Sequence, residues 1–150
     1  EAVRAMARIC QAAESHPAYL RAPSVWHERG STGAAMAQAV AAIAQQVGAR
    51  AVLAFTESGA TARRVSKARP VVPVIAASPH PDVLRRTALY AGVVPLEVAQ
   101  GADTDDMIAK GTSAAVDAGL IRSGDRIAFV AGVPVGEPGQ TNLVKVEVVR

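Results

Sequence analysis

The sequence predicts an α/β domain: a three-layer sandwich in which helices cover both faces of a five-stranded, mostly parallel sheet. Short runs rich in Val, Ile and Ala alternate with helical segments along the chain, and this alternation is typical of parallel strands joined by right-handed crossovers. Half of the 150 residues are hydrophobic but only 3% are aromatic, so aliphatic side chains build the core. A chain of this length forms one domain.

The start of the chain predicts a helix outside that domain. Residues 1–15 have the period of an amphipathic helix. Its apolar side carries Val3, Met6, Ile9, Cys10 and Ala13. Residues 16–29 contain two prolines and no clear period, so we expect a linker there and the α/β domain at 30–150. Because the chain opens in helical period without a starting Met, we expect it to be a piece of a longer polypeptide.

The next elements follow from apolar runs and from the residues that interrupt them. A long Ala-rich helix begins after Gly30 and ends at Gly48. We then expect a strand at 51–55, a helix at 61–67, a strand at 71–77, a helix at 82–90 and a strand at 93–98. Pro95 lies inside the last of these and lacks the N–H that a central strand needs, so this strand belongs at a sheet edge.

Acidic residues mark the start of the last helix. Asp103, Asp105 and Asp106 lie where side-chain carboxylates stabilise the positive end of a helix, and we interpret them as caps rather than as an acid/base pair or a metal cluster. Gly119 ends this helix. A strand at 126–131, a Gly/Pro-rich loop at 132–142 and an alternating strand at 143–149 follow. The short loop predicts antiparallel pairing of the last two strands, with the overall order 3-2-1-4-5.

Charge and cysteine content argue against several classes of partner. The net charge is +3, but the basic residues are scattered and aromatic residues are few, so we expect no nucleic-acid partner. A lone cysteine, Cys10, and the lack of a secretory signal predict a cytoplasmic location. No apolar run approaches the ~20 residues of a membrane-spanning helix, so we expect no membrane partner. The isolated His16 and His27 lack ligand spacing, and no metal is expected. His80, between two prolines, is interpreted as surface decoration.

The segment after the first strand is a candidate anion site. It leads into a helix, whose unpaired first-turn N–H groups and positive dipole end attract anions. Gly59 permits close approach of a ligand, and Thr56, Ser58 and Thr61 add hydroxyl groups. Such hydroxyls also cap helices without binding anything, which is the alternative interpretation.

Topology predicts a second wall for this site. In the order 3-2-1-4-5 the strand order reverses between the first and fourth strands, and ligands of open α/β sheets bind beyond the carboxyl ends of the strands at that point. The loops that follow those two strands, 56–61 and 132–142, are also the two richest in Gly, Ser and Thr. Together they predict one phosphate or anion site.

Longer motifs reveal a family resemblance. They are EAVRAMARI at 1–9, TESGATAR at 56–63, VSKARP at 65–70, TDDM at 104–107 and GVPVGEPGQTNL at 132–143. In these the chain resembles the C-terminal domain of pyruvate kinase over essentially its whole length. The first motif resembles the last helix of the catalytic barrel of that family.

The resemblance implies a regulatory domain. In many members a sugar phosphate or nucleotide effector binds between the loop after the first strand and the Gly-rich loop, and the domain forms one interface of a homotetramer. Carried over by position, the effector site comprises Thr56, Ser58, Gly59, Thr61, Gly136, Gly139, Thr141 and Asn142. Members that bind fructose 1,6-bisphosphate usually have Lys or Arg where this chain has Ala60. Arg63 or Arg64 is a candidate replacement, and a bisphosphate, a monophosphate or no effector all stay open.

The resemblance also implies what this segment lacks. In glycolysis the family transfers a phosphoryl group from phosphoenolpyruvate to ADP, giving pyruvate and ATP, with Mg²⁺ and K⁺. The metal-binding and cationic residues that phosphoryl transfer needs belong to the barrel. We therefore expect no catalytic residue, metal or cofactor here, the catalytic barrel as a partner, and no kinase activity in the chain alone. The alternative is a stand-alone phosphometabolite-binding or interaction module.

Overall fold

A five-stranded sheet with the order β3-β2-β1-β4-β5 forms the centre of the domain. The computed structural model describes residues 1–16, 30–136 and 140–150. The strands are β1 (Ala51–Phe55), β2 (Val74–Ser78), β3 (Val93–Glu97), β4 (Arg126–Ala131) and β5 (Leu143–Val148). The first four are parallel and β5 runs antiparallel to β4, so the predicted fold class and strand order are confirmed.

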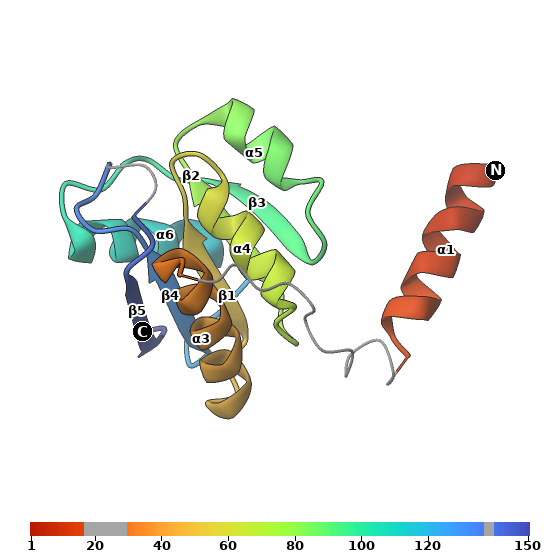
Figure 1. Cartoon of the computed structure of the whole chain (residues 1–150), viewed down its shortest axis with the longest axis horizontal. Coiled ribbons are helices and arrows are strands. Elements are labelled where there is room, and N and C mark those ends of the chain that lie inside the picture. The colour runs from red at the N-terminus through yellow and green to blue at the C-terminus, as the bar shows by residue number, and fades with distance from the viewer. Residues whose placement is uncertain (17–29, 137–139) are drawn as a thin grey trace.

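Helices flank this sheet on both sides (Figure 1). They are α3 (Thr32–Gln46), α4 (Ala60–Ala68), α5 (Pro81–Thr87) and α6 (Thr104–Asp117), and α1 (Ala2–Glu14) precedes them. No residue of α1 is buried, and its apolar side is open, with Met6 64% exposed. Most of the predicted linker, residues 17–29, lies outside the described residues.

One face of the sheet packs against α6. Successive side chains of a strand point to opposite faces, and Leu53 and Phe55 of β1 share a buried cluster with Met107 and Ile108 of α6. The ring of Phe55 stacks on that of Phe129 with a centroid separation of 6.4 Å. This cluster is the floor beneath the carboxyl end of β1.

The other face of the sheet packs against α3 and α4. Val52 and Ala54 of β1 lie in a second buried cluster with Val40 of α3 and Val65 of α4. Ala37 and Ala44 of α3 belong to the same cluster, so small side chains let this helix approach the sheet closely. The Ala-rich sequence of α3 thus has a packing role.

Two element boundaries differ by three residues from the sequence prediction. The second strand begins at Val74 rather than at 71, because Pro73 has no N–H to donate and contributes only its carbonyl, which accepts from the N–H of Val52 at 2.9 Å. The fourth helix, α5, ends at Thr87. The chain then continues in a tighter turn, in which Tyr90 N–H donates to Thr87 O at 3.0 Å.

The predicted edge strand and the predicted cap are both confirmed. Pro95 lies in β3, at the edge of the sheet, where its missing N–H costs no ladder bond. Asp103 is the N-cap of α6, and its carboxylate accepts from the N–H of Asp106 at 2.9 Å. The strand order places β1 between β2 and β4, so the loops after these three strands emerge side by side.

Candidate functional site

The loop after β1 leads into helix α4, whose N-terminus has no side-chain cap and lies beyond the carboxyl end of β1. Gly59 is the N-cap of α4, in the left-handed conformation with φ of 83°, and no side chain caps this helix. The hydroxyls of Thr56, Ser58 and Thr61 therefore do not serve as caps, and the capping interpretation of this loop is wrong. The first-turn N–H groups of α4 have no acceptor within the helix and are available to an anion.

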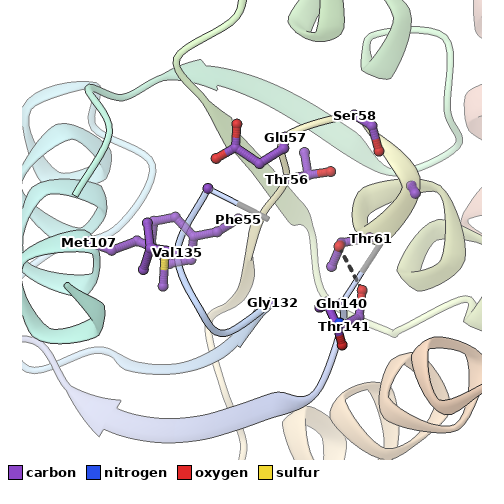
Figure 2. Close-up of a pocket in the computed structure, with 12 residues that line it drawn as sticks. Phe55, Thr56, Glu57, Ser58, Thr61, Met107, Gly132, Val135, Gln140 and Thr141 are labelled. Carbon is purple, nitrogen blue, oxygen red and sulfur yellow. Dashed lines mark hydrogen bonds between the residues drawn. The ribbon is translucent and has the colours of Figure 1, made fainter. Parts of the chain in front are cut away.

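The Gly-rich loop after β4 meets this helix end through two buried threonines. The hydroxyl oxygens of Thr61 and Thr141 lie 2.9 Å apart, and the two residues are 7% and 3% exposed. Figure 2 shows this hydrogen bond joining the two loops. The pair carries two hydroxyl protons, of which the bond uses one. No acceptor for the second is present in the described residues.

Asn142 braces the Gly-rich loop from within. Its side-chain oxygen accepts from the N–H of Val133 at 2.8 Å, and its side-chain nitrogen donates to the carbonyl of Val133 at 2.7 Å. Its own N–H donates to Ala131 O at 3.1 Å. Both polar atoms of the Asn142 side chain therefore bond within the Gly-rich loop and do not face the space between the two loops.

A narrow pocket lies between the two loops (Figure 2). Its apolar floor consists of Phe55, Met107 and Val135. Its polar rim consists of Thr56, Glu57, Ser58, Thr61, Gln140 and Thr141. The cavity volume is about 30 Å³, which admits a few water molecules at most, so a larger ligand lies across its mouth or displaces a loop.

The predicted residues separate into three groups. Thr56, Ser58, Thr61, Gly136 and Thr141 line the pocket. Gly59 ends the loop as the cap of α4, and Asn142 turns to Val133. Gly139 lies outside the described residues. Gly136 has a φ of 87°, and a Cβ there would lie 2.7 Å from the side-chain nitrogen of Gln100, so only glycine fits this position.

The pocket lining contains no cation among the described residues. Its one charged residue is Glu57. Arg64 points toward α3, with side-chain atoms 3.2–3.3 Å from the Cβ position of Gly33, and Arg63 is exposed and does not line the pocket. Neither arginine therefore lies where it replaces a cation at Ala60.

The neighbouring loop contributes a histidine and the neighbouring helix an arginine. His80 Nε2 lies 2.9 Å from Glu57 Oε2, and Arg86 Nη2 donates to the carbonyl of Ser58 at 3.4 Å. Arg86 was not predicted from the sequence, and His80 was interpreted as surface decoration. The predicted strand order could have indicated both residues, because β2 pairs with β1 and so places the start of α5 beside the loop after β1.

In residues 1–16, 30–136 and 140–150, no three His, Cys, Asp or Glu side chains gather to hold a metal ion. None of the helices in this part of the chain is both long and apolar enough to span a bilayer.

Comparison with known proteins agrees with this fold. Residues 34–147 match the family described as "Pyruvate kinase, alpha/beta domain". The chain belongs to this family. It is 37% identical over 152 residues to the pyruvate kinase of Clostridium acetobutylicum, covering 100% of this chain and 32% of that protein. The resemblance inferred from the sequence motifs is thereby confirmed.

Two further pyruvate kinases match over much of the chain. Pyruvate kinase 2 of Synechocystis sp. is 37% identical over 150 residues, covering 100% of this chain and 25% of that protein. The pyruvate kinase of Geobacillus stearothermophilus is 43% identical over 115 residues, covering 77% of this chain and 20% of that protein. The chain therefore spans a third or less of the length of each of these relatives.

Proposed function

We propose that the chain is the regulatory and oligomer-forming domain of a pyruvate kinase and binds a phosphorylated effector between the loop after β1 and the Gly-rich loop after β4. The parent protein would transfer a phosphoryl group from phosphoenolpyruvate to ADP in glycolysis, in the cytoplasm. The observation that carries the effector site is the hydrogen bond between Thr61 and Thr141. It brings the Gly-rich loop directly onto the uncapped N-terminus of α4.

The chemistry of this junction suits a phosphate group. A phosphate oxygen at the start of α4 accepts from the first-turn N–H groups and gains from the positive end of the helix dipole. The unused hydroxyl proton of the threonine pair and the hydroxyl of Ser58 are further donors. Because Gly59 has no side chain, the ligand approaches the backbone closely.

The size of the pocket predicts how an effector would bind. A cavity of about 30 Å³ is too small for a sugar or a nucleoside, so only part of the phosphate enters. The remainder of a sugar phosphate or nucleotide lies over the mouth and requires the Gly-rich loop to move outward. Effector binding and loop position are then linked, which is the requirement for regulation.

Catalysis would reside in the barrel of the parent chain, with its Mg²⁺ and K⁺. The exposed apolar side of α1, with Val3 78% and Ile9 69% exposed, is the surface that the barrel would cover. We expect the chain alone to have no kinase activity. In the parent we expect a homotetramer, in which β5 offers an unpaired sheet edge with Val148 52% exposed.

A stand-alone interaction module is the second candidate. The small volume and the lack of a lining cation in the described pocket favour it, because a module that only binds another protein needs neither. Sedimentation of the chain with and without a sugar phosphate separates the two. A complex whose formation depends on the sugar phosphate supports the regulatory domain, whereas self-association without any phosphoester binding supports the module.

Calorimetric titration tests the effector site directly. The chain is titrated with glucose 6-phosphate, fructose 1,6-bisphosphate and AMP, and the best ligand is then titrated into Thr61→Val. We expect at least tenfold weaker binding, because the variant lacks the hydroxyl that faces the phosphate. Thr112→Val is the matched control: its hydroxyl is buried in α6 without a partner, and binding should be unchanged. Heat with none of the ligands, or equal binding by Thr61→Val, would remove the proposal.

A further inference from the structure

The proposed effector site has a charge deficit. A phosphomonoester carries up to two negative charges near neutral pH, yet the described pocket lining offers one carboxylate, Glu57, and no Lys or Arg. Backbone N–H groups and hydroxyls solvate a phosphate but do not neutralise it. A cation from a residue outside the lining would therefore add a charge-assisted bond to a bound phosphate.

Helix α5 lies in direct contact with the loop after β1. A Cβ built on Gly59 would lie 3.5 Å from Thr87 and 3.6 Å from Val83, both on α5. On the same helix, Arg86 Nη2 donates to the carbonyl of Ser58 at 3.4 Å. The guanidinium thus already lies against a residue of the pocket rim.

Arg86 is weakly held by its present partners. Its bond to the Ser58 carbonyl is long, its distance to the carboxylate of Asp82 on the same helix is 3.9 Å, and its side chain is 59% exposed. A guanidinium with five donors exchanges one long bond to a neutral carbonyl for a charge-assisted bond to a phosphate oxygen with a net gain. Ser58 itself lines the pocket, so a rotation of the Arg86 side chain from the Ser58 carbonyl toward the pocket is the movement that this exchange requires.

The carboxylate of Glu57 does not compete for this arginine. It lies 2.9 Å from His80 Nε2, in the loop that precedes α5. That contact holds the carboxylate toward His80. Glu57 is therefore paired with His80, whereas Arg86 has only long contacts.

We infer that Arg86 is the phosphate-binding cation of the effector site, and that with a single such cation the site takes a phosphomonoester with one phosphoryl group. This inference rests on the proposed function and adds to it the class of ligand and the residue that selects it. A bisphosphate gains no second ion pair in this site, so its second phosphoryl group adds little affinity.

The test compares two adjacent arginines. Arg85 precedes Arg86 on α5 and is exposed, and among the described residues it makes no hydrogen bond to the loop. Arg85→Ala therefore removes the same charge from the neighbouring position of the helix. Binding of glucose 6-phosphate is measured by calorimetry for both variants. We expect about tenfold weaker binding for Arg86→Ala and less than a twofold change for Arg85→Ala. Arg86→Lys keeps the charge but loses the paired N–H donors of the guanidinium, so its affinity should lie between those of the two alanine variants.

The outcomes separate this inference from the function on which it rests. Equal binding by Arg86→Ala and Arg85→Ala, with Thr61→Val still impaired, overturns the role of Arg86 and leaves the effector site standing. A more than tenfold preference for fructose 1,6-bisphosphate over glucose 6-phosphate overturns the single-cation ligand class. Absence of binding by the unmodified chain overturns both proposals. If Arg86→Ala unfolds, the affinities of Arg86→Lys and Arg86→Gln are compared with that of Arg85→Ala instead.

Discussion

Thr61 and Thr141 share a buried hydrogen bond of 2.9 Å although 80 positions separate them in the sequence. One belongs to the first turn of α4 and the other to the end of the Gly-rich loop. The contact exists because β1 and β4 are neighbours in the sheet, so the segments that follow them emerge at the same edge. It fixes the distance between the two walls of the candidate site.

The energetic link between these walls is measurable as a coupling free energy. Thr61→Val or Thr141→Val alone leaves one buried hydroxyl without a partner and should lower the free energy of unfolding by about 1–2 kcal/mol. The double variant replaces both hydroxyls by methyl groups and should cost less than the sum of the single changes. Urea unfolding of the four proteins measures this, and additive single effects would show that the hydroxyls do not interact.

Asn142 should control the order of the Gly-rich loop. Asn142→Ala removes both side-chain hydrogen bonds to Val133 and should cost about 1–2 kcal/mol. Hydrogen exchange locates the effect, because the N–H of Val133 loses its acceptor and should exchange faster than in the unmodified chain. Gln140→Ala, an exposed side chain of the same loop, is the control. Unchanged exchange at Val133 in Asn142→Ala would contradict the bracing role.

Gly111 should be intolerant of a methyl group. A Cβ at this position would lie 2.5 Å from the ring of Phe55, which itself stacks on Phe129. Gly111→Ala raises helix propensity, yet the overlap should dominate and lower stability by about 1–3 kcal/mol. Ser113→Ala, on the exposed side of the same helix, should be neutral or slightly stabilising. Thermal unfolding distinguishes them; a Gly111→Ala chain as stable as Ser113→Ala would refute this packing.

Acid should weaken the start of α6 through Asp106. Its hydrogen bond from Lys110, and next the N–H of Ala102, hold the pKa of the Asp106 carboxyl below its ordinary value of 3.8. A depressed pKa means that the ionised carboxylate stabilises the folded chain above pH 3.8, and that this contribution disappears as the pH falls through the folded-state pKa.

The variant Asp106→Asn isolates this contribution. It should be less stable than the unmodified chain at neutral pH, and the difference should shrink as the pH falls below 3.8. Asp117→Asn, on the same helix, is the control, since no described residue forms an ion pair or hydrogen bond with the Asp117 side chain. Chemical unfolding at several pH values measures both. A difference between Asp106→Asn and the unmodified chain that does not change with pH would contradict the assignment.

Much of the fold could be predicted because its signals are local. Alternation of Val-rich runs with helical segments predicted the sheet, Pro95 predicted an edge strand, and Asp103 predicted a helix cap; the strand pairing and the capping bond confirm these. The boundary at Pro73 was missed because its apolar neighbours continue the pattern of a strand. The carbonyl of Pro73 joins the sheet, but it has no N–H to donate.

The meeting of the loops after β1 and β4 could be predicted, but only some of their contacts could. The strand order brings the loops after β1 and β4 together, so Thr61 and Thr141 could be predicted as neighbours from topology. The role of Asn142 in bracing Val133 depends on how the loop folds back on itself, for which the sequence carries no period. Likewise Arg86 reaches Ser58 only because α5 packs on Gly59, which is a tertiary contact.

The central claim is that the uncapped start of α4, closed by the Gly-rich loop, binds a phosphate. A titration of the ¹⁵N-labelled chain with glucose 6-phosphate, followed through its backbone amide resonances, tests it most directly. We expect saturable shifts concentrated at the amides of residues 58–62 and at Thr141, with α1 unaffected. Shifts confined to other parts of the chain, or no shift up to millimolar ligand, would contradict it.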